Sequence, residues 1–292
     1  STRYSSFIIP REDYESGWDD GSPVYTPMYA MHHGALGHTI EIPDINEHSY
    51  NALIACGLAA AKFALDNKDE LYINQLEIFR RGIENIDAKE LVDKEFVDGH
   101  GNVVGRPRGE YDNFFPEYYV IPVDPSLQRN VLEAHLMVEY LLRNGILVDR
   151  TTVDVAVGDK VYPKGTYVVD MHQAIRGYAN AVLSDGYDIS TFDDMYAETV
   201  MNFHDVWGFD RDAIREKDVF KGKVERITEV HIPRTETPNA SDYYIIKNNT
   251  NDAIRGINEL LKKGEKVSMT LSSGNGYEAG DFVVTHKGLY MI

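Results

Sequence analysis

The chain has 292 residues, 43% of them hydrophobic and 26% charged, which is the composition of a folded globular protein with one large domain or two ordinary ones. Its 47 acidic and 29 basic residues give a formal net charge of −18. Because that charge repels phosphate groups and no Lys/Arg cluster reverses it locally, we expect neither nucleic acid nor an anionic membrane surface as a partner. No apolar run reaches the roughly 18 residues of a membrane span.

The single cysteine, Cys56, lies in the run of small residues 55–61. With one cysteine the chain can form neither an internal disulfide nor a cysteine zinc cage, and we expect the thiol to be buried by packing. The first residue, Ser1, is not a methionine, and the last five residues, 288–292, are mostly apolar. We therefore expect the chain to be part of a longer protein.

The first predicted elements surround a short alternating stretch. Residues 1–34 are rich in Asp, Gly, Pro and Tyr and predict a loop. Residues 37–43 alternate apolar and polar side chains and predict a strand. Asn46 is a suitable N-cap for a helix that runs to about residue 67, and a second helix is predicted over residues 69–85.

A polar, glycine-rich segment follows at residues 89–113 and is the best candidate for a domain boundary. A small hairpin is predicted within it at residues 97–104. Residues 118–122 then predict a strand. Ser126 is the expected N-cap of the next helix, which Gly145 ends.

Alternating strands and helices continue to the end of the chain. Further strands are predicted at residues 146–148, 153–157, 166–169, 243–246 and 266–271, and helices at residues 173–183 and 252–263. Such alternation favours a layered α/β domain with parallel strand pairs, because a parallel connection needs a crossover. We divide the chain into residues 1–88, a linker at 89–115 and an α/β domain at 116–292.

Glu41 is the most conspicuous polar residue of the predicted strand, since Ile40 and Ile42 flank it. Alternation places its side chain on the same face as that of Thr39. A carboxylate among apolar neighbours must find a partner or have its pKa raised, which is the environment of a general acid or base. The alternative is a half-exposed strand carboxylate paired with an Arg or a Lys.

The pattern Gly-x-x-Gly-x-Thr-x-Glu-x-Pro at residues 34–43 resembles the segment of carboxypeptidase A-like zinc carboxypeptidases that ends in the catalytic glutamate. In that family the last helix of the catalytic domain follows, as residues 46–67 do here. Residues 74–82, 118–125 and 162–167 resemble the region after the peptidase domain in large bacterial members. Those members often append a domain similar to class I glutamine amidotransferases. The resemblance thus implies the end of a mixed-sheet carboxypeptidase domain followed by an amidotransferase-like α/β domain.

The resemblance implies a secreted bacterial hydrolase that removes C-terminal residues from peptides. Glu41 would take a proton from a zinc-bound water and pass it to the departing amine. Thr39 takes the position that borders the side-chain pocket, and Tyr25, with Tyr29 near it, is the candidate for the tyrosine of the family's substrate loop. The family's zinc ligands, His-x-x-Glu and a further His, precede the glutamate, and 40 residues precede Glu41 here. We therefore expect no zinc to be bound by this chain alone, and the isolated chain to be inactive.

Other candidate sites have simpler interpretations. His38 and Glu41 form a His-x-x-Glu string, but on a strand their odd spacing sends the two side chains to opposite faces. The pair His32 and His33 is expected on a loop surface. The amidotransferase-like domain would be catalytically inactive, because Cys56 precedes it and no cysteine follows. Four later histidines show no shared metal spacing and are expected in core or surface roles: His135, His172, His204 and His231.

The competing hypothesis is a non-enzymatic module of a surface or secreted protein, whose α/β domain binds a partner or a carbohydrate. The aromatic-rich segment 187–207 could line such a surface, although packing between layers is its simpler role. An incomplete peptidase sheet would expose an apolar edge and face. We therefore predict self-association, or a covering contact from residues 1–34.

Overall fold

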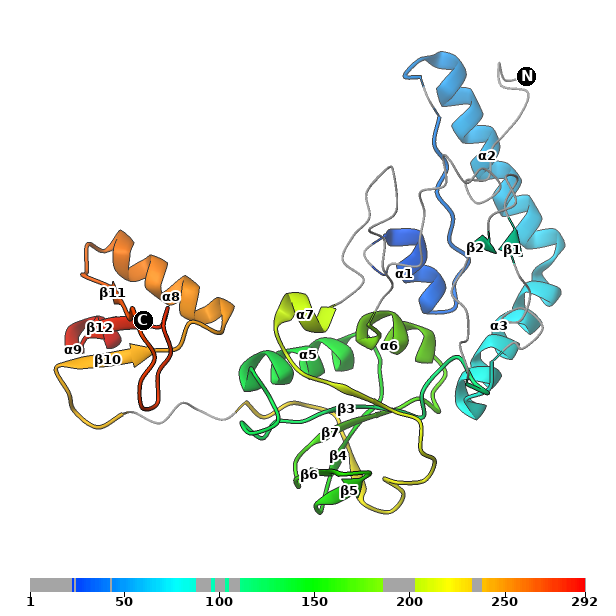
Figure 1. The fold of residues 1–292 in the computed structure, drawn as a ribbon. Coiled ribbons are helices and arrows are strands. Elements are labelled where there is room, and N and C mark those ends of the chain that lie inside the picture. The colour runs from blue at the N-terminus through cyan, green and yellow to red at the C-terminus, as the bar shows by residue number, and fades with distance from the viewer. Residues whose placement is uncertain are drawn as a thin grey trace.

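The computed structural model is a mixed α/β structure with antiparallel sheets (Figure 1). It describes residues 23, 25–42, 44–87, 96–97, 103–104, 111–185, 203–232 and 238–291. The described residues form an N-terminal arm of helices, a central part built on a five-stranded sheet, and a C-terminal part built on a three-stranded sheet.

The central sheet has the strand order β8-β3-β7-β4-β9. Its strands are β3 (Tyr118–Ile121), β4 (Val148–Thr151), β7 (Tyr167–Asp170), β8 (Asp212–Ile214) and β9 (Val224–Ile227). Every neighbouring pair is antiparallel, so the expectation of parallel pairs in this part is wrong. A chain in which strands and helices alternate can still place antiparallel strands next to each other. Here β5 and β6 also come between β4 and β7 in the sequence.

Helices cover one face of this sheet and enclose the larger core. They are α5 (Val131–Arg143), α6 (Arg176–Leu183) and α7 (Phe203–Trp207). Met137, Leu141 and Tyr178 are fully buried in that core. Trp207, the end of the aromatic segment, packs edge-on against Tyr140 at 5.7 Å, so this described part of the segment has the predicted packing role. Residues 187–202 of the segment lie outside the described residues.

The ends of α5 show how the chain starts and stops a helix. The side chain of Asn130 accepts a hydrogen bond from the Glu133 amide at 3.3 Å, so Asn130 is the N-cap and the assignment of Ser126 was wrong. Ser126 instead donates both its amide and its hydroxyl to Asp124, in the turn before the helix. Gly145 has φ +80° directly after the helix and ends it as predicted.

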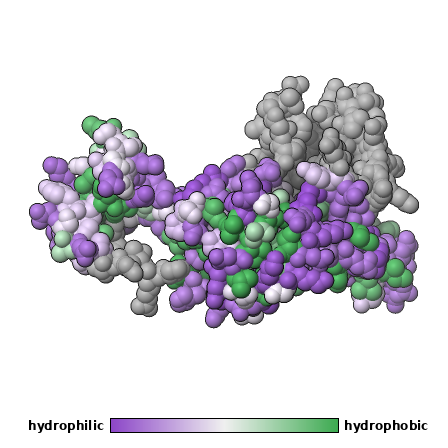
Figure 2. Space-filling view, turned by 60° about the horizontal axis from the view of Figure 1, so that its bottom comes forward, coloured by the Kyte–Doolittle hydropathy of each residue, from purple (hydrophilic) through white to green (hydrophobic). Residues whose placement is uncertain are grey.

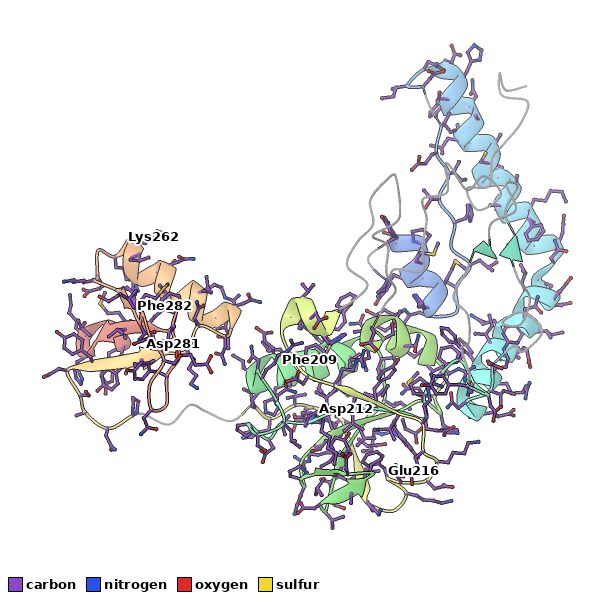
Figure 3. All side chains as sticks on the ribbon, viewed as in Figure 1. Phe209, Asp212, Glu216, Lys262, Asp281 and Phe282 are labelled. Carbon is purple, nitrogen blue, oxygen red and sulfur yellow. The ribbon has the colours of Figure 1, made fainter. Side chains whose placement is uncertain are left out.

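The opposite face of the sheet carries a second, smaller core. The hairpin of β5 (Val155–Val157) and β6 (Lys160–Tyr162) lies on this side. Tyr162 and Phe220 are fully buried there. Asp212 ties the hairpin to the edge strand β8, since its Oδ2 accepts hydrogen bonds from Tyr162 Oη at 2.9 Å and Lys160 Nζ at 2.5 Å (Figure 3).

The N-terminal arm consists of α1 (Thr26–His32), α2 (Glu47–Asp66) and α3 (Lys68–Glu84). The last two follow each other at Asn67 and extend away from the central sheet (Figure 1). Asn46 accepts a hydrogen bond from the Ser49 amide at 3.0 Å, which confirms the predicted N-cap. The short strands β1 (Phe96–Val97) and β2 (Val103–Val104) confirm the predicted hairpin.

The C-terminal end of α3 is fixed to the central part. Gly82 approaches the loop before α6 so closely that a Cβ atom would lie 2.6 Å from the Gln173 carbonyl oxygen. Asn85 ends the helix in the left-handed region at φ 47° and donates its Nδ2 to the Pro116 carbonyl at 3.0 Å. Buried Arg176 donates to Asn85 Oδ1 at 2.7 Å. One end of the arm is therefore rigidly held.

The C-terminal part has the strand order β10-β12-β11, with both pairs antiparallel. Its elements are β10 (Tyr243–Ile246), α8 (Asn251–Lys262), β11 (Ser268–Met269), β12 (Phe282–Thr285) and α9 (His286–Leu289). Leu260 of α8 packs with Phe282 and Val284 of the central strand. The strand-helix-strand order was predicted, but a parallel pair was not formed because β12 lies between the other two strands.

Asn130 and Asn249 join the two sheet-bearing parts: Asn130 Nδ2 donates to the Asn249 carbonyl at 2.7 Å. Figure 2 shows the surface that comes forward from the bottom of Figure 1; hydrophobic patches over the central part are bordered by hydrophilic residues. None of the helices in the described part of the chain combines the length and apolar character that a membrane crossing requires.

Candidate functional site

Glu41 lies on an irregular segment, not on a strand. Residues 36–42 have no strand pairing, so the predicted strand is wrong for this described range. Alternating side chains fit a pleated surface, but a strand forms only where a neighbouring strand pairs with its backbone. Glu41, Thr39 and His38 are exposed, while Ile40 and Ile42 are half-buried. The alternation is thus preserved as a difference in exposure, although no ladder forms.

The two glycines of the 34–43 pattern let this segment pass between helices. Gly34 has φ +84° directly after α1, and Gln75 of α3 donates a hydrogen bond to its carbonyl. Gly37 lies against Pro27 of α1, where a Cβ atom would come within 2.8 Å of the carbonyl carbon. A side chain at either position would push the segment off the helices. The spacing of these glycines therefore fixes the path of the chain that leads to Glu41.

The tyrosines and histidines before Glu41 hold α1 in place. Tyr25 is the N-cap residue of α1, and Tyr29 Oη donates to Asn144 Oδ1 at 2.9 Å. His33 contacts the Tyr29 carbonyl at 2.9 Å and the Asn144 carbonyl at 3.0 Å with its two ring nitrogens. Its ring also lies 4.8 Å from that of Tyr178. The loop-surface interpretation of His33 is therefore corrected: it is half-buried and packs α1 against the end of α5.

The described residues do not fit a zinc site. Within them, no three His, Cys, Asp or Glu side chains are grouped so that they could hold a metal ion. Cys56 is exposed on α2, against the expectation of burial, because α2 lacks a packed neighbour over most of its surface. His135 is buried next to Tyr167 Oη, at 2.9 Å, and burial lowers its pKa, which fits the predicted core role.

A cavity of about 280 Å³ lies on the face of the central sheet opposite α5 and α6. Its apolar base is formed by Tyr118, Val168, Phe220 and Val224, and its polar wall by Asp149, Asp170, His172, Asp218 and Lys221. The base residues belong to the smaller core or pack against it. Four strands and two loops therefore supply one concave surface.

Hydrogen bonds fix two of the polar groups of the wall. Asp170 Oδ1 accepts from the His172 amide and lies 2.9 Å from His172 Nδ1. The other ring nitrogen, Nε2, lies 3.8 Å from the Glu117 carboxylate. Asp149 Oδ1 accepts from Arg226 Nε at 2.5 Å across the β4–β9 pair. His172 is thus placed between two carboxylates, and Asp149 is already neutralised by an arginine.

Tyr118 supplies a protonated hydroxyl to the cavity. Burial, together with the negative charges of Asp170, Glu117 and Asp218, raises its pKa to about 12. The Asp218 amide donates towards the hydroxyl oxygen. Asp218 itself adopts φ +61°, a conformation that Asp and Asn accept more readily than most residues. The hydroxyl therefore keeps its proton and can act as a hydrogen-bond donor.

Sequence reasoning did not find this cavity. The spacing of His172 from the other histidines excludes a shared metal site but does not indicate its pairing with Asp170. The available signal was the polar pair Asp170 and His172 at the end of the buried strand Tyr167–Asp170. The remaining wall residues lie about 20 to 50 positions from this pair, so only the fold brings them close to it.

A shallower cavity of about 420 Å³ lies on the open face of the C-terminal sheet. It is lined by Tyr243, Ile245, Thr270, Leu271, Ser272, Tyr277 and Val283. None of these side chains is charged, and Leu271 is almost fully exposed. The surface therefore offers apolar side chains and hydroxyl groups to a contact.

Comparison of the chain with protein-family models, curated proteins and solved structures found no match. The similarity of residues 34–43 to zinc carboxypeptidases thus rests on their sequence pattern.

Proposed function

We propose that this chain belongs to a secreted, zinc carboxypeptidase-like hydrolase, in which Glu41 is the general base and residues 116–291 form an accessory α/β region. The observation that carries the proposal is the apolar surface of α2, the helix that begins six residues after Glu41. In the proposed hydrolase, this surface of α2 is buried in the core of the catalytic domain.

The apolar surface of α2 is a continuous stripe, because its residues recur at the three- and four-residue spacing that defines one helix face. Its large members are 44% to 70% exposed: Tyr50, Leu53, Ile54, Leu58 and Leu65. We call these five residues the α2 stripe. Burying them would contribute of the order of 5 kcal/mol.

Gly57 lies in the middle of the α2 stripe and has no neighbouring atom within 4 Å of where a Cβ would stand. A glycine costs an exposed helix about 1 kcal/mol relative to alanine. Close approach of another backbone is the usual reason for such a residue. Both features support a partner surface that packs tightly against α2, as the resemblance to the last helix of a carboxypeptidase domain implies.

Glu41 would be covered by the same partner surface, since it directly precedes α2. Removal of water would then raise the basicity of its carboxylate and suit it to accept a proton from the attacking water and give it to the leaving amine. A zinc ion, when bound, supplies the activated water in this chemistry. The described residues do not provide its ligands, so other residues would have to hold it.

The test is a peptidase assay on the protein as its source cells express it, supplied with zinc and N-acylated dipeptides. Glu41→Gln should lower the release of the C-terminal amino acid by about 10²- to 10⁴-fold, the usual effect of losing a general base. Glu47→Gln is the matched control, because Glu47 is an equally exposed carboxylate at the start of α2. Unchanged turnover in Glu41→Gln would remove Glu41 from the mechanism.

A second candidate function, a non-catalytic binding module, is favoured by the polar cavity of the central sheet. A protein that binds no zinc and releases no amino acid, yet binds a ligand in that cavity, would support this alternative.

A further inference from the structure

We propose that the cavity between β3, β7 and the loop after β8 binds an alkylammonium group, either the side chain of a lysine or the free N-terminus of a peptide. The proposal does not depend on the function of Glu41, because no residue of the cavity belongs to the N-terminal arm. Shape, charge and a hydroxyl group that lines the cavity support it.

The shape of the cavity suits a side chain and not a large ligand. Its volume of about 280 Å³ lies at the lower end of ligand pockets. The rings of Tyr118 and Phe220 meet edge to face at 5.1 Å in its base. Such rings pack against methylene groups and attract a cation over their faces. An aliphatic chain that ends in a cation would meet both requirements.

The charge of the wall favours a cation. The wall carries three aspartates and one lysine: Asp149, Asp170, Asp218 and Lys221. Arg226 satisfies Asp149, and Lys221 lies 3.2 Å from Asp218 in an ion pair that is more than 70% exposed. An exposed pair of this kind exchanges partners at little cost. Asp170 is bonded to His172 through Oδ1, which leaves its second oxygen, Oδ2, for a ligand.

Tyr118 adds an independent reason to expect a ligand. Tyr118 is 7% exposed and lines the cavity, and its hydroxyl, which accepts from the Asp218 amide, keeps its own proton for donation. A hydroxyl at the surface of a cavity can donate that proton to a ligand oxygen. A peptide carries a carbonyl oxygen near each ammonium group. A bare metal ion is disfavoured, because the wall does not group three metal ligands in the described residues.

The test is calorimetric titration of the full chain with three small probes. Nα-acetyl-lysine amide carries the side-chain ammonium, alanine amide carries the N-terminal ammonium, and Nα-acetyl-norleucine amide is the uncharged analogue of the first. Saturable binding of either ammonium probe, without binding of the norleucine probe, supports the proposal and identifies the source. Equal binding of the norleucine probe, or binding of neither ammonium probe, would overturn it.

Variants locate the binding. Asp170→Asn should weaken the ammonium probe about tenfold, the effect of one charged hydrogen bond. Asp218→Asn, which keeps the left-handed backbone conformation, should weaken it up to about fivefold. Asp159→Asn is the matched control, since Asp159 is an exposed carboxylate in the β5–β6 turn of the same part. Equal losses in all three variants, or displacement of the probe by millimolar calcium or magnesium, would contradict an organic-cation site. Glu41→Gln should bind as the unaltered chain does.

Discussion

Arg176 Nη1 donates a hydrogen bond to Asn85 Oδ1 at 2.7 Å, and this contact between buried residues fixes the N-terminal arm to the central sheet. The guanidinium also donates to the Ile86 carbonyl and stacks 4.0 Å from the Phe115 ring centre. Burial lowers the pKa of Arg176 to about 10. The arm is thus held by a buried cation that donates hydrogen bonds to uncharged oxygens, and the nearby Asp87 carboxylate stabilises its charge.

Arg176→Lys should therefore destabilise the chain although the charge is kept. Lysine cannot donate to Asn85 and to the Ile86 carbonyl in the same fork, and it loses the planar contact with Phe115. We expect the free energy of unfolding, measured by urea denaturation, to fall by about 2–3 kcal/mol. Arg255→Lys, at an exposed position on α8, should leave it within about 0.5 kcal/mol. Equal effects of the two changes would show that the contacts of Arg176 with Asn85, Ile86 and Phe115 are not important for stability.

Two glycines on the same arm should respond oppositely to alanine. At Gly82 the new Cβ would stand 2.6 Å and 2.7 Å from the carbonyl oxygens of Gln173 and Ala174, so Gly82→Ala should cost about 1–3 kcal/mol. At Gly57 nothing lies within 4 Å, and Gly57→Ala should stabilise the isolated chain by up to about 1 kcal/mol. Thermal unfolding of both variants measures the difference, and a shift of the same sign in both would disprove the close contact at Gly82.

The α2 stripe should make the isolated chain self-associate. Leu58→Lys, and separately Leu65→Lys, place a charge in the stripe and should shift the sedimentation of the chain towards the monomer. Phe63→Lys is the control, because Phe63 is comparably exposed but points to the other side of α2. If Phe63→Lys dissociated the chain equally well, general hydrophobicity and not the stripe would be responsible.

Buried histidines should make the chain less stable in mild acid. Burial, with a smaller effect of nearby His231, holds the pKa of His135 below its usual value. Below about pH 6.5 the unfolded chain therefore takes up a proton that the folded chain resists, and stability falls as the pH is lowered from that point. His135→Gln can still bond Tyr167 but does not titrate, so its loss of stability between about pH 7.5 and 5 should be smaller.

His48→Gln, an exposed position on α2, is the control and should show the full acid loss. His204 adds to that loss, since burial and Arg211 lower its pKa as well. The raised pKa of Glu133, caused by burial, acts in the opposite direction at lower pH. An unchanged pH profile in His135→Gln would show that His135 titrates equally in both states.

Local signals predicted most of the elements correctly. Asn46 and Gly145 each act within one turn of their own helix, so the sequence near them contains the whole cause. The hairpin at 96–104 is likewise local. The direction of strand pairing is not a local property: β10 and β11 pair only through β12, which comes later in the chain. That is why the parallel arrangement was predicted wrongly.

Local sequence likewise predicts some features of the candidate sites and not others. The glycines at 34 and 37 were noticed as a pattern, and the structure shows the close helix contacts that they allow. The exposure of Glu41 and Cys56 differs from the predictions, because the sequence predicts a strand at Glu41 and burial of Cys56 by packing, and both depend on neighbours distant in the chain. Asp170 and Asp218 come together in the cavity wall because β7 pairs with β3 and the loop after β8 lies beside them. No short sequence motif encodes this arrangement.

The placement of β12 between β10 and β11 has a consequence for biosynthesis. β10 finds its partner 36 positions later, because Ile246 pairs with Phe282. Until the ribosome has released Phe282–Thr285, both earlier strands lack their neighbour, and the apolar cluster around Leu260 lacks Phe282 and Val284. The three strands of this sheet therefore cannot pair one after another as they are synthesised, and the sheet forms only once β12 has been made.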